Sequence, residues 1–403
     1  MIGPMRMWIY IVRRLLLLLP VIIGVMTITF VLISTLPIGE RLQSYYGPSK
    51  FGYAPTCSTT QEGCVCVTPF NGTCPNPAYV RGTSALGLNK PIYIQWLQYM
   101  KNSLTLNWGS TDHGSKASGT LLGGSTIPVT TVLSYYLPYT LELATFSLLL
   151  ILALAIPLGN YSAVYRNRPL DQATRVMSFS GFALPGFLLA LLLLLGATIL
   201  AGQFQTICNG QSTPYFEFYG SWPPTVCYPG GVGPTWIGAY YQTSPTGFPT
   251  VDALIHHNWF LAWESVKRQI LPALTIAYGS VAGILRFVRN SMLEVMNLDF
   301  IRTARSKGVS ESVVVSKHAG RNSLNVTITV LGLTFAYFIG GFAIIEDVFN
   351  LKGIGLLLAY SIQPSIDFGL VFGTTLLFTI IVVTANIIVD ILYAYLDPRV
   401  RLG

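Results

Sequence analysis

Long apolar runs recur along the chain and are separated by polar stretches that are rich in glycine, proline and serine. A helix that crosses a bilayer needs about 20 mostly apolar residues. Six runs have roughly this length and predict transmembrane helices: Leu15–Leu36, Leu141–Leu158, Val176–Leu200, Ile270–Val288, Val326–Ile345 and Leu370–Ala394. The pattern therefore predicts an all-α polytopic membrane protein with six transmembrane helices.

The runs divide the chain into five parts. These are an N-terminal tail with the first transmembrane helix (1–36), an external domain (37–133), the second and third transmembrane helices (134–201), an external loop (202–268), and the last three helices with a cytoplasmic loop at 297–322 (269–403). The first run follows several arginines, as in a signal peptide, but it is longer than a signal h-region and ends in STLPIG. We expect it to be retained as a membrane anchor.

Charge is scarce and unevenly distributed. Hydrophobic residues make up 52% of the chain and charged residues 10%, against about 25% charged residues in ordinary soluble domains. The formal net charge is +8, and no run of Lys and Arg indicates a nucleic-acid partner. Most of the 24 Lys and Arg lie near the N-terminus, in residues 164–175 and 289–325, and near the C-terminus. Under the positive-inside rule these segments face the cytoplasm, which predicts a multi-pass plasma-membrane protein with both termini cytoplasmic.

The cysteines all lie in the two regions assigned to the external side: Cys57, Cys64, Cys66, Cys74, Cys208 and Cys227. Disulfides persist outside the cytosol, so these residues are disulfide candidates. A zinc site is disfavoured, because the spacing of Cys64 and Cys66 does not suit one and no histidine lies nearby. The pairing stays open; we favour a Cys208–Cys227 bridge and two bridges among the other four. Asn71 begins an Asn-Gly-Thr sequon and is a glycosylation candidate.

The sequence lacks the motifs of an enzyme or of a self-powered pump. It contains no Gly-Lys dipeptide and hence no P-loop for ATP, and neither G-x-S-x-G nor H-E-x-x-H occurs. The predicted spans are nearly bare of ionisable residues, and we interpret Glu142 and Asp390 as structural polar groups rather than a proton relay. The chain is therefore expected to be a non-catalytic pathway that binds no cofactor or metal and receives its energy from elsewhere.

One polar segment between the predicted spans has an unusual composition. Residues 299–313 read DFIRTARSKGVSESV and predict a short helix, a glycine bend and a second helix. Asp299 is expected to cap the first helix, Gly308 to adopt the left-handed conformation after its end, and Ser310 to cap the second helix.

The first of these helices is too short and too charged to span a bilayer. Helical spacing places Phe300, Ala304 and Lys307 on one face. By composition alone such a helix either lies on anionic lipid or docks in a groove of another protein. For a groove, the expectation is that Phe300, Ile301 and Ala304 enter it while the cations Arg302, Arg305 and Lys307 meet an acidic rim.

The order of residues in this segment resembles the EAA loop of binding-protein-dependent ABC importer permeases. Ala304 and Gly308 match that pattern, and residues 299–311 with 317–322 are similar to the version found in the dipeptide/oligopeptide/nickel subgroup. Four further stretches resemble the same subgroup: LGLNKP at 86–91, LPYTLEL at 137–143, QILPAL at 269–274 and LDPR at 396–399. The cysteine-containing external insertions depart from the family pattern, as does the absence of an I-x-L-P stretch.

The resemblance implies a set of partners. A second, similar permease would complete the translocation pathway in the lipid bilayer, and an external solute-binding protein would deliver the solute. Two cytoplasmic ATPase subunits would bind ATP and Mg. By resemblance the ATPase-docking residues are Asp299, Phe300, Ile301, Arg302, Thr303, Ala304, Arg305, Lys307 and Gly308.

The resemblance leaves the solute open. Oligopeptides are the favoured substrate, and oligosaccharides are the alternative within the same ABC permease role. Nickel is disfavoured because the spans offer almost none of the His, Cys and carboxylate ligands that it takes. An alternative of another class is a channel or surface-assembly membrane protein without ATPase coupling.

Overall fold

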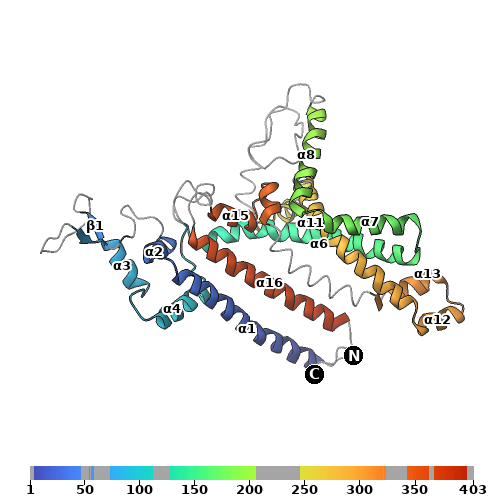
Figure 1. Ribbon diagram of the computed structural model, residues 1–403, viewed down its shortest axis with the longest axis horizontal. Helices are drawn as coiled ribbons and strands as arrows, with labels where there is room; N and C mark the ends of the chain where they lie inside the picture. The colour runs from blue at the N-terminus through green and yellow to red at the C-terminus, as the bar shows by residue number, and fades with distance from the viewer. Residues whose placement is uncertain are drawn as a thin grey trace. The chain divides into compact units, whose positions relative to one another are not determined.

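The protein was analysed as a computed structural model, which describes residues 4–46, 54, 56–58, 73–111, 127–205, 246–320, 322–323, 343–362 and 367–396 (Figure 1). Within these ranges the chain is almost entirely helical. The helices are α1 (Pro4–Ser34), α2 (Ile38–Tyr46), α3 (Pro77–Ala85), α4 (Ile92–Leu104), α6 (Val129–Val164), α7 (Pro169–Ala183), α8 (Gly186–Gln205), α10 (Pro249–Ile255), α11 (Trp259–Met296), α12 (Asp299–Ser306), α13 (Glu311–Val313), the π-helix η2 (Val314–Gly320), α15 (Ile354–Ile362) and α16 (Phe368–Leu396). Two short strands, β1 (Thr56–Ser58) and β2 (Thr73–Pro75), pair antiparallel.

Three of the described helices are long and apolar enough to cross a membrane. They are Val129–Val164, Ser265–Met296 and Gly369–Ile388, and they contain the second, fourth and most of the sixth predicted spans. The first predicted span falls within α1, whose segment Pro20–Ser34 is a shorter apolar helix. Most of the fifth predicted span lies outside the described residues. The structure therefore supports an all-α membrane protein, and six spans stay a prediction.

The third predicted span is not one continuous helix. α7 and α8 meet at an angle of 107°, with Leu184 and Pro185 between them. Leu184 is extended, with φ −91° and ψ 117°. A proline lacks the N–H of the helical hydrogen bond and disfavours helical backbone at the residue before it, so the Leu-Pro step ends α7. Together the two helices form either one broken span or a re-entrant loop.

Two compact units make up the chain: unit 1 contains residues 1–12, 138–355 and 382–403, and unit 2 contains residues 13–137 and 356–381. In unit 1 the helices α7, α8 and α10 all pack against α11. Small residues allow the close approach, because a Cβ on Gly159 of α6 would press on Val288, and one on Gly181 of α7 would overlap Ala282. Such small contacts are typical of helix pairs in membranes.

Unit 2 contains the β-ribbon and the helices α2, α3 and α4. Gly82 of α3 packs so closely on Leu42 of α2 that a Cβ there would press on the leucine side chain. α4 contacts α1 through a hydrogen bond of 3.2 Å from the Trp96 indole to Thr27 Oγ1. α4 thus attaches the predicted external domain to the first predicted span.

Candidate coupling site

The segment 299–310 folds as the sequence predicts, as a short helix followed by a glycine bend. α12 follows α11 after only residues 297 and 298, so it is attached directly to a candidate membrane span. Gly308 has φ +74°, and its N–H donates to the Arg305 carbonyl at 2.9 Å, while the Val309 N–H donates to the Ala304 carbonyl at 3.2 Å. This pair of bonds is a Schellman motif, which satisfies the carbonyls at the end of the helix.

The expected apolar face is only partly available to a partner. Ile301 and Ala304 are buried within the chain itself, in a cluster with Met292 of α11, Ala163 of α6 and Val314 of η2. The expectation that Ile301 and Ala304 enter a groove on another protein is therefore wrong. A spacing of three residues puts both on one helical face, and the ends of α6 and α11 cover that face.

The two predicted caps also differ from the expectation. Asp299 is the first residue of α12 rather than its cap; Leu298 occupies the cap position and makes no side-chain cap bond. The Asp299 carboxylate lies 3.5 Å from the Arg302 guanidinium instead. Ser310 does occupy the cap position of α13, but its hydroxyl makes no cap hydrogen bond.

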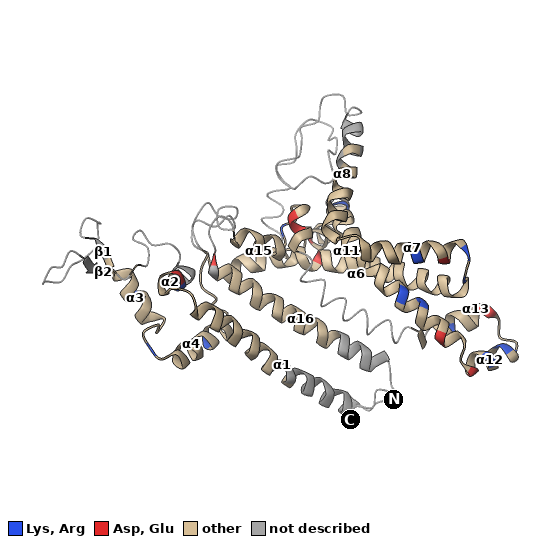
Figure 2. Ribbon diagram, viewed as in Figure 1, with Lys and Arg blue, Asp and Glu red and all other residues tan. Residues whose placement is uncertain are grey.

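The outward face of α12 combines cations with one aromatic ring. Phe300 keeps 41% of its surface exposed, and Arg302, Thr303 and Lys307 are exposed beside it. The carboxylate of Glu311 accepts two hydrogen bonds from Arg305, at 2.6 and 3.0 Å, which link α12 to α13 across the bend. These hydrogen bonds lower the pKa of Glu311 and raise that of Arg305. Figure 2 shows how charged residues gather in α12, α13 and the neighbouring end of α11.

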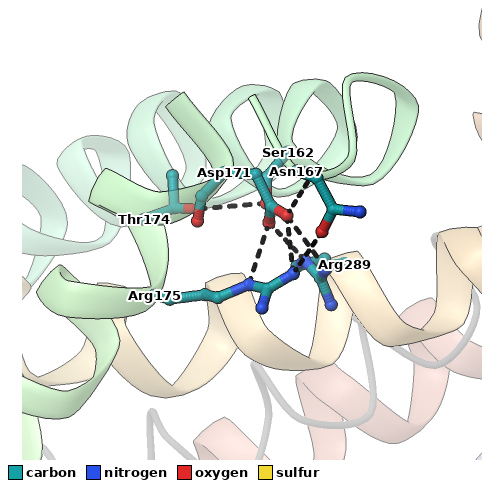
Figure 3. A network of polar contacts seen from close by, with 6 residues as sticks. All are labelled: Ser162, Asn167, Asp171, Thr174, Arg175 and Arg289. Carbon is teal, nitrogen blue, oxygen red and sulfur yellow. Dashed lines mark hydrogen bonds and ion pairs between the residues drawn. The ribbon is translucent and has the colours of Figure 1, made fainter. Parts of the chain in front are cut away.

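A buried carboxylate, that of Asp171, links the ends of α6, α7 and α11 next to α12 (Figure 3). Asp171, near the start of α7, is fully buried and lies 2.7 Å from Arg175 and 2.8 Å from Arg289 of α11. It also accepts hydrogen bonds from the Ser162 hydroxyl of α6 at 2.8 Å and from the Asn167 backbone N–H at 2.9 Å. One side chain thus joins α6, α7 and α11 just before the chain enters α12.

Two further buried carboxylates, those of Glu142 and Glu346, lie at the N-terminal half of α6. Glu142 accepts from the Thr250 N–H at the start of α10, at 3.0 Å. Glu346 accepts from the Thr140 hydroxyl at 2.7 Å and from the Gly355 N–H at the start of α15, at 2.6 Å. Glu142 thus satisfies an orphan donor at a helix N-terminus, and its interpretation as a structural group stays a prediction.

Asp171 and Glu346 were not predicted from the sequence as organising residues. Asp171 could have been found as a lone acid among the arginines of residues 164–175. Nothing in the sequence pairs it with Arg289, 118 positions later. Glu346 stands at the edge of a predicted span, where an acid is costly unless it is bonded.

Of the predicted disulfide and glycosylation sites, only Cys57 and Cys74 of the β1–β2 ribbon lie within the described residues. The β1–β2 register places Cys57 directly opposite Cys74. The remaining candidates lie outside the described residues: Cys64, Cys66, Cys208, Cys227 and Asn71. The disulfides and the glycan therefore stay predictions.

Comparisons with known proteins define the class of protein. The family model "Binding-protein-dependent transport system inner membrane component" matches residues 155–402, more than half of the chain. The chain belongs to this family, whose members are non-catalytic permease subunits of transporters, and the resemblance noted in the sequence is confirmed.

Individual relatives agree with this assignment. The oligopeptide transport system permease protein AppB of Bacillus subtilis (strain 168) is 30% identical over 392 residues, which cover 97% of this chain and 99% of that protein. The "Probable D,D-dipeptide transport system permease protein DdpB" of Escherichia coli (strain K12) is 34% identical over 318 residues, which cover 79% of this chain and 83% of that protein. The dipeptide transport system permease protein DppB of Alkalihalophilus pseudofirmus is 29% identical, with 97% and 99% covered.

Proposed function

We propose that this chain is one of two permease subunits of an ABC importer for oligopeptides. The support for the peptide substrate is that the relatives above are named as permeases of oligopeptide and dipeptide transport systems. In this proposal a second permease completes the pathway, an external binding protein supplies the peptide, and two cytoplasmic ATPase subunits bind ATP and Mg. In the same proposal the nucleotide sites belong to the ATPase subunits.

The proposed topology has six spans, with both termini and α12 on the cytoplasmic side of the plasma membrane. The bias of Lys and Arg toward residues 164–175 and 289–325 supports this orientation. On the external side we propose disulfides among the six cysteines, all of which lie in the two regions assigned to that side.

The observation that carries the coupling role is the two-sided construction of α12. Its inner face is packed against the ends of α6 and α11, and its outer face presents Phe300 among exposed cations. An ATPase cleft with an apolar floor and an acidic rim would match the outer face. A displacement of the docked helix would pass directly into α11, because only residues 297 and 298 separate the two.

Substitution of Phe300 tests the docking surface. We expect Phe300→Asp to weaken retention of the ATPase subunits by about tenfold or more, because a partly buried aromatic anchor is replaced by a charge. The matched control is Val313→Asp, a similar change at a residue of α13 that is also exposed and lies outside the docking segment. The measurement is co-purification of the ATPase subunits, together with ATP-dependent uptake of labelled peptide into proteoliposomes.

Full ATPase retention and uptake in Phe300→Asp would contradict the docking role. The substrate has its own test in the same proteoliposomes, with peptides and oligosaccharides offered in parallel. ATP-dependent uptake of oligosaccharides without peptides would reject the peptide assignment and leave the permease class intact.

A further inference from the structure

An arginine-lined cavity of about 480 Å³ lies between α7 and α11. Four arginines border it: Arg166 before α7, Arg175 within α7, and Arg286 and Arg289 on α11. The volume is in the range of small-ligand sites, which is roughly 300–1,000 Å³. The known class of the protein gives this cavity no role.

The positive charge of the cavity is only partly compensated. Asp171 pairs with Arg175 and Arg289 and holds both guanidinium groups in place. Among the described residues, neither Arg166 nor Arg286 forms an ion pair or a side-chain hydrogen bond. Four cations against one carboxylate leave a net charge of +3, so the cavity favours an anion.

The same cavity has an apolar side. Phe179 and Phe182 of α7 border it and are 72% and 67% exposed, and Leu285 and Leu293 of α11 complete the apolar part of the lining. α11 carries a candidate membrane span, and Arg286 and Arg289 lie in its C-terminal third, toward α12. A ligand that fits both sides has an anionic head and a hydrocarbon tail.

We propose that this cavity binds the phosphodiester headgroup of an anionic phospholipid such as phosphatidylglycerol. Arg166 and Arg286 supply unengaged donors, Asp171 orients Arg175 and Arg289, and the acyl chains lie along Phe179 and Phe182. Basic pockets between transmembrane helices on the cytoplasmic side are suited to such headgroups. The proposal rests on the membrane placement given under the proposed function, but not on the peptide substrate or on ATPase docking.

A bound lipid would bridge α7 and α11 close to the point where α11 leads into α12. Arg289 and Leu293 border the cavity, and Met292 of the same stretch packs against Ile301 and Ala304. Occupancy would therefore stiffen the connection through which α12 acts on the spanning helices.

Binding is measured on the full-length chain in neutral detergent, with any subunits that remain bound. Phosphatidylglycerol is titrated against phosphatidylcholine, with native mass spectrometry or thermal shift as the readout. The double variant Arg166→Gln/Arg286→Gln is expected to lose about tenfold or more in affinity for phosphatidylglycerol, since it removes the two cations that have no other anion to pair with in the described part of the chain. The matched control removes two exposed cations that neither border the cavity nor belong to the docking segment, Arg168→Gln/Lys317→Gln, and is expected to bind as the unaltered chain does.

Three results would overturn the proposal. The first is equal loss in both double variants, which would mean a diffuse surface charge effect. The second is equal binding of phosphatidylcholine and phosphatidylglycerol. The third is binding of inorganic phosphate that phosphatidylglycerol does not displace, which would identify a soluble anion as the ligand.

A third variant separates the headgroup from the tail. Phe182→Ala is expected to weaken the binding of phosphatidylglycerol and to leave the weak binding of inorganic phosphate unchanged. All of these measurements omit nucleotide and peptide, so a failed lipid site and a failed transport assignment give different results.

Discussion

The two ends of the helical body in unit 1 stabilise their buried carboxylates in different ways. Near Ser162 of α6, Asp171 is compensated by two arginines. Near Thr140, about 30 Å away along the same helix by its rise per residue, Glu346 is bonded to a hydroxyl and to a helix N-terminus. Glu142 at that end likewise accepts from a helix N-terminus.

The difference follows from where cations can be placed. Arginine has a long apolar stem and keeps its head in water or among headgroups, so it is tolerated at one end of a spanning body. At the other end the N-termini of α10 and α15 donate to Glu142 and Glu346, and the partial positive charge of a helix N-terminus favours such an anion. The comparison teaches that a lipid-facing body can hold acids at both ends while it concentrates its cations beside the coupling segment.

Removal of the Asp171 carboxylate should cause the largest loss of stability. Asp171→Asn leaves Arg289 without its anion, and the loss expected for breaking a buried ion pair is about 3–5 kcal/mol. Only 14% of the Arg289 side chain is exposed, against 47% for Arg175. Thermal unfolding in detergent measures the loss of stability.

Arg175→Gln is the control for this prediction, and it should cost about 1 kcal/mol or less because that side chain is half exposed. The double variant Asp171→Asn/Arg289→Gln should recover part of the stability. Equal losses in Asp171→Asn and Arg175→Gln would show that burial does not set the strength of this network.

At the opposite end, Gly353→Ala should have an intermediate effect. An added Cβ would overlap the carboxylate of Glu346 and displace it from Gly355. Overpacking of this kind costs about 1–3 kcal/mol. The measurement is the same thermal unfolding experiment.

Gly196→Ala in α8 provides the comparison, since a Cβ there meets nothing within 4 Å. It should be neutral or stabilising by up to about 1 kcal/mol, because alanine favours a helix over glycine. If both alanine variants unfold at the same temperature, the hydrogen bonds of Glu346 do not stabilise the end of unit 1 near Thr140.

The smallest expected effect concerns the exposed pair Arg305–Glu311. The hydrogen bonds from Arg305 lower the pKa of Glu311 in the folded chain. A carboxylate with a lowered pKa contributes stability above its unfolded pKa, near 4.3, and this contribution is lost as the pH falls through the folded value. Exposed pairs of this kind contribute roughly 0.2–1 kcal/mol.

Hydrogen exchange of residues 299–313 between about pH 6 and pH 3 should therefore show a small increase in opening on acidification. Glu311→Gln should open equally at both ends of this range once the intrinsic exchange rate is corrected. A pH response that persists in Glu311→Gln would assign it to another acid.

The location of the membrane helices was readable from the sequence because run length and hydropathy are local properties. The runs at 141–158 and 270–288 lie within α6 and α11, and the Gly308 bend has the predicted left-handed backbone. Residues 176–200 were predicted as one continuous span, and the break was missed although Leu184-Pro185-Gly186 interrupts the apolar run. The docking role of residues 299–308 stays a prediction.

What the sequence by itself determined is the class of protein, the apolar helices and the short basic helix that ends at a glycine, because these depend on composition and spacing over neighbouring residues. Tertiary structure alone decided that Ile301 and Ala304 face inward, that Asp171 meets Arg289, and that Glu346 meets the start of α15. Each of these depends on segments far apart in the chain, and the physical reason is that burial and the compensation of charge are settled only when those segments pack together.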